Sequence, residues 1–382
     1  MLSHPEFGFA TTATEAAGAF GEEIRGKTVL ITGISPSSIG SGLAHALASQ
    51  SPALLILASR TLSNIQLVTS SIHKLYPTIR IAEIELDLSS LSSVRLAVVE
   101  IKRVVAERPG GEIDVLFNNA GINISWREMV GSGKDGEGEG EGWEKQFVTN
   151  YLGPWLFTGL VLPLMVSSKS APAGPSPANS GPTAPQEFRR HKRIINTSSE
   201  AHRISPIRFS DLHQTPGVKV LREEEPRRGM PVGTLRGDGG YEPAIAYGMS
   251  KTANVLHCVE LGRRFREIGV GSWAVSPGNI MTGLVRGADE QMLNGMLSGI
   301  PDSEWKTIDQ GAATLVVAGF DPALEANDGT YLHDCQFKRP SKWASDPVIA
   351  ERLWKVSKEM VGEGFDIETV KRGSGNGKMS RL

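Results

Sequence analysis

Tyr247 and Lys251, four positions apart in the run YGMSK, are the residues of this chain best suited to acid–base chemistry. On a helix, side chains at this spacing lie on one face, a turn apart. A neighbouring ammonium stabilises a phenolate, so we expect the tyrosine pKa to fall by about 1–3 from its ordinary value near 10, toward the range useful to a general acid or base. The same spacing also occurs in surface pairs that contribute only about 0.2–0.5 kcal/mol, so the surrounding sequence has to decide.

A second chemical feature lies near the start of the chain. Residues 27–33 (KTVLITG) read as an apolar strand, and SGLAHALAS after residue 40 reads as a helix with Leu43 and Leu47 on one face. A strand, a glycine-rich turn and a helix N-terminus together form an anion site, where Gly33 and Gly40 let the backbone approach a pyrophosphate. Ser37 or Ser38 could cap the helix. A turn of this kind alone is also compatible with a tight turn of no function.

The alternation of strands and helices continues along the chain. Apolar strands are expected at 53–59, about 79–86, 113–121, 192–198 and 270–276, and the segments between them carry helical apolar stripes. Such a pattern predicts an α/β fold with a doubly wound parallel sheet of the Rossmann type, built as a single domain with flexible inserts. Ligands bind at the carboxyl ends of such strands. That edge would gather Gly33, the run Asn118 to Gly121, Ser199 and the pair Pro277-Gly278.

From about residue 25 to about residue 362 the chain resembles the short-chain dehydrogenase/reductase family. The resemblance rests on the order of seven motifs: TGISPSSIG (32–40), ELDLSS (85–90), NNAG (118–121), TNYLG (149–153), INTSS (195–199), YGMSK (247–251) and SPGNIMT (276–282). The C-terminal segments GTYLHDCQ (329–336) and WASDPVIAERLWKVSKEMVG (343–362) are similar to the retinol-dehydrogenase-like and related plant and fungal branches.

The resemblance implies a catalytic set of Asn150, Ser199, Tyr247 and Lys251. Tyr247 would exchange the proton with the substrate oxygen, Ser199 rather than Ser198 would hydrogen-bond that oxygen, Lys251 would hold the ribose, and Asn150 would position a water. Asp87 would contact the adenine and Thr282 the nicotinamide carboxamide. The full set of implied cofactor-binding residues is Gly33, Ser38, Ile39, Gly40, Arg60, Asp87, Asn119, Ala120, Gly121, Tyr247, Lys251, Pro277, Gly278 and Thr282.

The second strand ends in Ala58-Ser59-Arg60, which bears on the choice of cofactor. NAD(H) sites place a carboxylate there, whereas an arginine suits the 2′-phosphate of NADP(H), which it can bind with two parallel hydrogen bonds. We therefore expect NADP(H) rather than NAD(H). The alternative is a solvated arginine that happens to follow a strand.

Several segments depart from the family pattern. Ser38 stands where a glycine is usual, and its β-carbon could crowd the pyrophosphate. An insert at about 205–243 beside the substrate cleft is either a lid or a solvated loop. The low-complexity segments 131–142 and 167–186, an N-terminal arm (1–24) and a C-terminal tail (363–382) are expected to be flexible.

Composition limits the partners. The net charge of −2 argues against nucleic acid, and no apolar run is expected to span a membrane. Cys258 and Cys335 make no disulfide framework. The terminal Ser380-Arg381-Leu382 is a variant of the Ser-Lys-Leu address, so we expect an import receptor as partner and a peroxisomal location, with a cytoplasmic one as alternative. The resemblance also implies a possible homo-oligomer.

The sequence thus predicts an NADP(H)-dependent oxidoreductase that interconverts a carbonyl and an alcohol. The length of the insert at 205–243 suggests a bulky apolar small molecule as substrate, of the lipid, terpenoid or polyketide type. Reduction of a C=C bond is a further enzymatic possibility. The alternative of another class is a non-catalytic dinucleotide-binding regulatory or scaffold protein, and its support is the altered glycine turn together with the long inserts.

Overall fold

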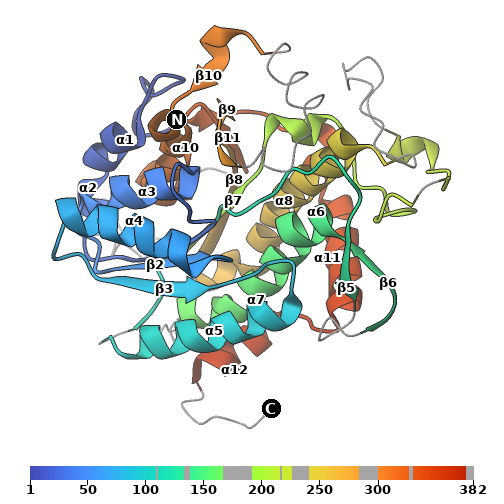
Figure 1. Ribbon diagram of the computed structural model, residues 1–382, viewed down its shortest axis with the longest axis horizontal. Coiled ribbons are helices and arrows are strands. Elements are labelled where there is room, and N and C mark those ends of the chain that lie inside the picture. The colour runs from blue at the N-terminus through green and yellow to red at the C-terminus, as the bar shows by residue number, and fades with distance from the viewer. Residues whose placement is uncertain are drawn as a thin grey trace, which may run out of the picture.

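The computed structural model describes residues 1–108, 111–132, 138–166, 192–215, 217–225, 241–283, 300–326 and 330–375. Its centre is an eight-stranded sheet of order β12-β11-β8-β7-β4-β1-β2-β3. Figure 1 shows the sheet running through the middle of the molecule, between the helices. Neighbouring strands run parallel except β12, which is antiparallel to β11. The strands are β1 Thr28–Thr32, β2 Leu54–Ser59, β3 Ile81–Glu85, β4 Val115–Asn118, β7 Lys192–Thr197, β8 Val270–Ser276, β11 Tyr331–His333 and β12 Gln336–Phe337.

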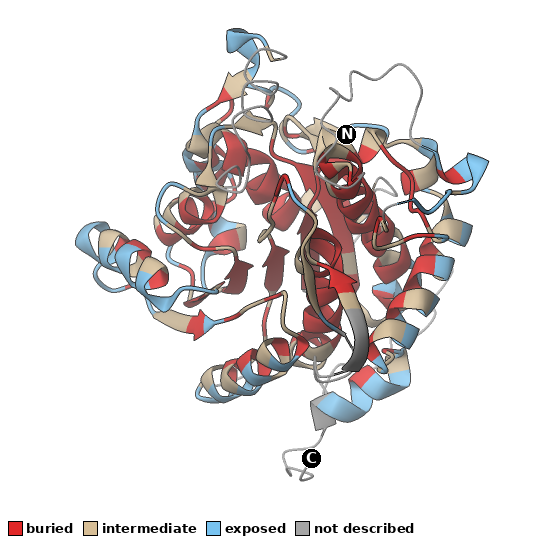
Figure 2. Cartoon of the chain, turned by 45° about the vertical axis from the view of Figure 1, so that its right-hand side comes forward, coloured by how far each residue is buried: buried red, intermediate tan, exposed pale blue. Residues whose placement is uncertain are grey.

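Helices cover both faces of the sheet because its strands are apolar on both sides. On β1, Leu30 packs into one core cluster while Val29 and Ile31 pack into the other, as the two-residue period of a strand requires. One layer holds α1 Ala13–Ala19, α2 Gly21–Ile24, α3 Ile39–Ala48, α4 Leu62–Leu75 and α10 Ile308–Phe320. The other holds α5 Leu91–Ala106, α7 Gly153–Met165, α8 Pro243–Phe265, α11 Pro347–Val361 and α12 Ile367–Gly375. Figure 2 shows the buried strands between helices whose outer sides are exposed.

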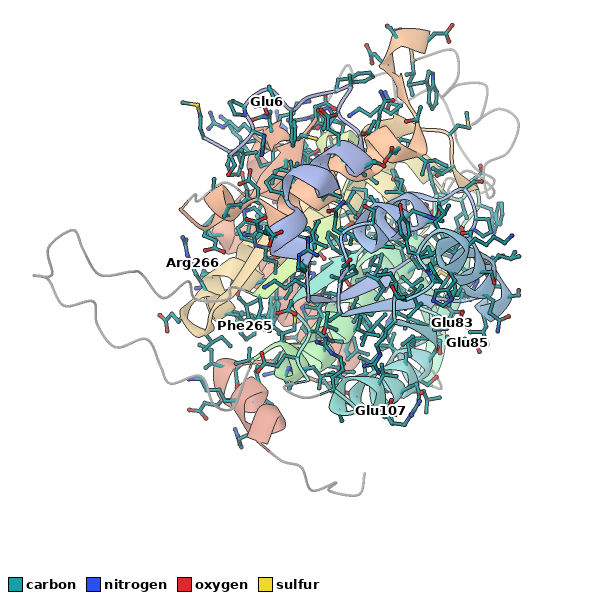
Figure 3. All side chains as sticks on the ribbon, turned by 90° about the vertical axis from the view of Figure 1, so that its left-hand side faces the viewer. Glu6, Glu83, Glu85, Glu107, Phe265 and Arg266 are labelled. Atoms are coloured by element: carbon teal, nitrogen blue, oxygen red, sulfur yellow. The ribbon has the colours of Figure 1, made fainter. Side chains whose placement is uncertain are left out.

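The predicted α/β fold with a mostly parallel sheet is confirmed. The six expected strands are present within a few residues of their predicted bounds. The long apolar segment before β7 is not one regular helix but is divided into α6 Lys145–Phe147, a π-helical turn at Val148–Leu152 and α7. Strands β11 and β12 extend the sheet beyond the prediction. At the other edge, β3 carries Glu83 and Glu85 side by side (Figure 3), and charged side chains on an edge strand oppose pairing with another chain.

The expectation of a flexible arm at 1–24 is wrong. Thr12 and Glu15 form a capping box that starts α1. Ala13, Ala16 and Phe20 are buried in the core cluster that also contains residues of helices α3 and α10. Ser3 also donates from its backbone N–H to Asp321 (2.9 Å). Small apolar residues at helical spacing therefore attach this segment to the domain.

The expected C-terminal tail is likewise ordered where the structure describes it. Phe365 and Val370 are buried in the core cluster that also contains α7, and α12 extends to Gly375. The polar composition of this segment led us to expect that the entropy cost of ordering it would keep it flexible. Burial of the two apolar side chains offsets that cost. The terminal Ser380-Arg381-Leu382 lies outside the described residues.

The three expected inserts have different outcomes. Part of the first one is ordered, because β5 Met129–Ser132 pairs with β6 Gly138–Glu144, although 133–137 lie outside the described residues. The whole of 167–186 lies outside them. Of the insert at 205–243, residues 205–215, 217–225 and 241–243 are described. Tyr241 in this insert is buried, and its hydroxyl donates to Glu144 (3.0 Å) and accepts from Gln146 (2.6 Å).

One helical segment among the described residues, Lys145–Met165, is long and apolar enough to cross a membrane. Inside the protein, 78% of its apolar stretch is buried. That degree of burial is typical of a core helix.

Candidate active site

A cavity of about 450 Å³ opens at the carboxyl ends of β1, β2, β4, β7 and β8, the edge where ligands bind in sheets of this type. Most residues that the sequence singled out lie on its wall. They are Gly33, Ser38, Ile39, Arg60, Asp87, Asn119, Ala120, Gly121, Ser199, Tyr247, Lys251, Pro277, Gly278 and Thr282. Two predicted residues, Gly40 and Asn150, are not among the residues that line it.

The glycine turn after β1 has no room for side chains at two positions. Gly33 has φ +82°, and a β-carbon there would be 2.6 Å from the Cα of Ala120. A β-carbon on Gly40 would be 2.6 Å from the carbonyl oxygen of Gly33. These glycines therefore allow β1, β4 and the start of α3 to converge at the cavity.

Ser38, and not Ser37, caps α3. Its hydroxyl accepts a hydrogen bond from the backbone N–H of Ser41 (3.1 Å) and donates to the carbonyl of Ser35 (2.7 Å). The Ser41 hydroxyl lies 3.1 Å from the backbone N–H of Ser38, which completes a capping box. The Ser38 side chain is thus hydrogen-bonded within its own turn, and the N-terminus of α3 faces the cavity with its positive dipole end.

The end of β4 is tied to the end of β1. The Thr32 hydroxyl accepts hydrogen bonds from the backbone N–H groups of Asn119 and Ala120, both at 3.1 Å. The Asn119 side-chain amide donates to the carbonyl of Thr32 (2.9 Å). Gly121 follows, and a β-carbon there would be 3.3 Å from both Asn150 Oδ1 and Lys251 Nζ.

Tyr247 and Lys251 lie on one face of α8, as predicted from their spacing. The Lys251 ammonium lies 5.4 Å from the centre of the Tyr247 ring and donates to the carbonyl of Thr197 (3.0 Å). Lys251 is buried, and Tyr247 is half-buried on the cavity wall.

The predicted lowering of the tyrosine pKa is wrong for this structure. Burial raises the pKa of Tyr247 to about 12, and a hydrogen bond with Ser199 acts in the opposite direction without cancelling it. Burial also lowers the pKa of Lys251 to about 8. Desolvation disfavours the charged form of both side chains. The prediction considered only the spacing of the two residues on a helix and not this cost of burial.

The two serines after β7 have different environments. Ser198 is buried, and its hydroxyl donates to the carbonyl of Lys251 (2.8 Å). Ser199 is more exposed and lines the cavity together with Ser198, but it is the Ser199 hydroxyl whose hydrogen bond acts to lower the pKa of Tyr247. The structure therefore brings the second serine, and not the first, to the tyrosine.

Asn150 lies in the π-helical turn between α6 and α7. Its amide nitrogen donates to the carbonyl of Ile122 (2.9 Å) and to the Ser250 hydroxyl (3.0 Å), while its oxygen accepts from the backbone N–H of Ile122 (2.8 Å). Asn150 thereby holds the loop after β4 against α8. Turns of this π-helical kind are frequent at functional sites.

Several features of the cavity fit a dinucleotide. The hydroxyls of Thr149 and Thr197 are buried on its wall and have no hydrogen-bond partner among the described residues. The positive end of α3 suits a pyrophosphate, and the exposed Arg60 follows β2, where the adenosine ribose of a dinucleotide lies in this type of sheet.

Sequence reasoning did not single out part of the wall. Glu128 and Lys145 form an ion pair of 2.6 Å at the base of the β5–β6 hairpin, and the charge of Arg60 reaches Glu128, contributing to its lowered pKa after the larger effect of the Lys145 hydrogen bond. Apolar wall residues that were missed are Ile122, Ile124, Trp126 and Ile280. Trp126 is 51% exposed. A tryptophan in the loop after a strand end was the one feature of the sequence that could have indicated this part of the wall.

Comparison with known proteins agrees with this geometry. The family model described as short chain dehydrogenase matches residues 27–173. The chain is 33% identical to oxidoreductase fscI of Fusarium equiseti, over 71% of this chain and 94% of that protein. It is 31% identical to mouse retinol dehydrogenase 12, over 89% and 88% of the two chains. The angucycline C-6 ketoreductase LanV with bound NADP has a similar fold, with a TM-score of 0.54 and 18% identity over 82% of this chain and 95% of that one. The chain therefore belongs to the short-chain dehydrogenase/reductase family of nicotinamide-dependent oxidoreductases.

Proposed function

We propose that this protein is an NADP(H)-dependent oxidoreductase that interconverts a carbonyl and an alcohol, with Tyr247 as the general acid and base. The observation that carries the proposal is the meeting of Ser199, Tyr247 and Lys251 on the wall of a cavity at the strand ends. Each of the three has a distinct chemical capacity there: a hydroxyl donor, a titratable phenol and a cation.

A bound nicotinamide would supply or accept the hydride. In reduction the Tyr247 phenol donates its proton to the substrate oxygen, and the Ser199 hydroxyl hydrogen-bonds the same oxygen as negative charge develops on it. With a pKa of about 12, Tyr247 is protonated at neutral pH, which suits the reductive direction. Oxidation needs the phenolate, so its rate should rise with pH above neutrality.

The preference for NADP(H) rests on Arg60. Its exposed guanidinium follows β2 and lies on the cavity wall, where no carboxylate ends the strand. A 2′-phosphate at that place would meet a cation able to form two parallel hydrogen bonds with it.

The proposed substrate is bulky and apolar, of the lipid, terpenoid or polyketide type. Ile122, Ile124, Trp126 and Ile280 provide apolar surface on the wall. Retinol dehydrogenases, which bear the name of an apolar alcohol, are among the relatives. Turnover confined to small polar ketones would contradict this part of the proposal.

The test is NADPH oxidation against a panel of aldehydes and ketones, with Tyr247→Phe measured in parallel. We expect the variant to lose about 100-fold or more of kcat, as is typical for removal of a general acid, and to keep NADPH binding. Tyr76→Phe is the matched control, because Tyr76 follows α4 and does not line the cavity. Wild-type protein that binds NADPH but turns over neither a carbonyl nor, with NADP⁺, an alcohol would favour a regulatory dinucleotide-binding role instead.

A further inference from the structure

We propose that His202 is a positioning residue that holds Ser199 at the distance from Tyr247 that proton exchange requires. This inference rests on the proposed function of Ser199 and Tyr247. His202 itself lies behind the cavity wall in the 3-10 turn Glu200–Arg203, which begins directly after Ser199, and it is completely buried.

The hydrogen bonds of the imidazole determine its tautomer. His202 Nε2 lies 3.2 Å from the backbone nitrogen of Ser341, and that N–H can only donate. Nε2 is therefore the unprotonated acceptor, and Nδ1 carries the hydrogen. Nδ1 lies 2.6 Å from the carbonyl oxygen of Ser199 and donates to it. Burial lowers the pKa of His202 to about 4, so the neutral ring persists at neutral pH.

The carbonyl of His202 ties the same turn to α8, the helix that carries Tyr247 and Lys251. It accepts hydrogen bonds from the Thr252 hydroxyl (2.9 Å) and from the Trp343 indole (3.1 Å). The neighbouring Gly248 allows close approach, since a β-carbon there would lie 2.8 Å from the carbonyl oxygen of Ala201. The turn after Ser199 is thus packed directly against the residues beside the tyrosine and the lysine.

The charged groups around His202 come from two directions. Glu200 and Arg203 lie on its own turn, and Lys338 approaches from the segment after β12, where it donates to Glu200 (3.0 Å). The Tyr331 ring of β11 lies 4.8 Å from the imidazole and its hydroxyl donates to Glu200 (2.7 Å). These contacts fix the turn to the edge of the sheet. The hydrogen bond from the imidazole to the Ser199 carbonyl then fixes Ser199 relative to the same edge.

The test compares His202→Phe with His202→Asn. Phenylalanine keeps a ring beside Tyr331 but removes both hydrogen bonds, whereas the asparagine amide can still donate at the position of Nδ1. We expect His202→Phe to lower kcat by about 10- to 100-fold, the size of effect that a small misplacement of a catalytic group produces, with NADPH affinity unchanged. His202→Asn should recover most of the loss.

A second readout does not depend on turnover. Tyrosinate absorbance is titrated with pH in each protein and in its Tyr247→Phe counterpart, and the difference gives the titration of Tyr247. Because the hydrogen bond with Ser199 lowers the pKa of Tyr247, the titration should move to higher pH in His202→Phe but not in His202→Asn.

Four outcomes distinguish a positioning role of His202 from a packing role of its ring and from failure of the proposed function. Wild-type kcat and an unmoved Tyr247 titration in His202→Phe overturn the proposal. Equal losses in both variants, with the Tyr247 titration unmoved, point to ring packing and also overturn it. If wild-type protein turns over no substrate, the proposed function fails, and the titration alone then judges the role of His202. A shift in His202→Phe alone supports it in either case.

Discussion

Lys145 is the charged residue of the cavity wall whose role is most open to a direct test. It pairs with Glu128, whose carboxylate also feels the charge of Arg60, so the Lys145 ammonium shares this part of the wall with a second cation. If a 2′-phosphate binds at Arg60, Lys145→Met should weaken NADPH binding by about 10-fold, equivalent to about 1.4 kcal/mol, and leave NADH nearly unchanged. Titration of both cofactors by fluorescence measures the ratio.

Glu128→Gln is the matched variant, since it removes the opposing charge. It should tighten NADPH relative to NADH. An equal loss of NADPH and NADH affinity in Lys145→Met would show instead that Lys145 acts on a part common to both cofactors.

The residues of the site were predictable to different degrees. Gly33, Asn119, Ser199 and Gly278 end or follow parallel strands, and the carboxyl ends of parallel strands meet at one edge whatever the details of packing. The pKa of Tyr247 was not predictable in this way, because it depends on how much water the folded wall excludes. Glu128 and Lys145 were missed because a hairpin, which carries no strand-end signal, brings them to the cavity.

At the scale of elements, we expect the cap of α3 to contribute to the stability of the fold and not to cofactor affinity. Ser38 hydrogen-bonds within its own turn, so Ser38→Ala should cost about 1 kcal/mol of unfolding free energy and Ser38→Gly only a few tenths. Chemical denaturation checks both values. Because the hydroxyl is bonded to Ser35 and Ser41, we expect NADPH affinity to stay the same in Ser38→Gly. Tighter binding in that variant would mean that the serine β-carbon crowds the pyrophosphate.

The helices and strands themselves could be predicted from the spacing of apolar residues wherever a segment was long and regular. Strands such as β2 (LLILAS) are buried on both faces and read as continuous apolar runs. The segments at the two chain ends were misjudged because their buried apolar residues are small or scattered among polar ones: Ala13, Ala16, Ala17 and Phe20 near one end, Phe365 and Val370 near the other. Only the tertiary partners of these residues show that they pack.

At the scale of the whole molecule, α7 is the helix around which one half of the fold is organised. The sheet lies on one side of it, and α12 lies on the other (Figure 1). Gly159 makes the second contact possible, because a β-carbon there would lie 2.1 Å from the Phe365 ring. A helix covered on both sides can be apolar all round, which accounts for its resemblance to a membrane span.

This packing predicts the effect of a change far from the cavity. Phe365 lies 5.2 Å from the Trp155 ring, centre to centre, and is 8% exposed, so Phe365→Ala should cost about 3 kcal/mol of unfolding free energy. Glu368→Ala on the exposed part of α12 is the control and should change stability little, since its ion pair with Arg372 is between exposed side chains. Because the cavity lies at the strand ends, Phe365→Ala should still bind NADPH with wild-type affinity at temperatures where it is folded. If urea unfolds Phe365→Ala at the same concentration as the wild type, α12 does not stabilise α7. If NADPH affinity falls together with stability, the C-terminal helix and the cavity are coupled through α7 and the π-helical turn that holds Asn150.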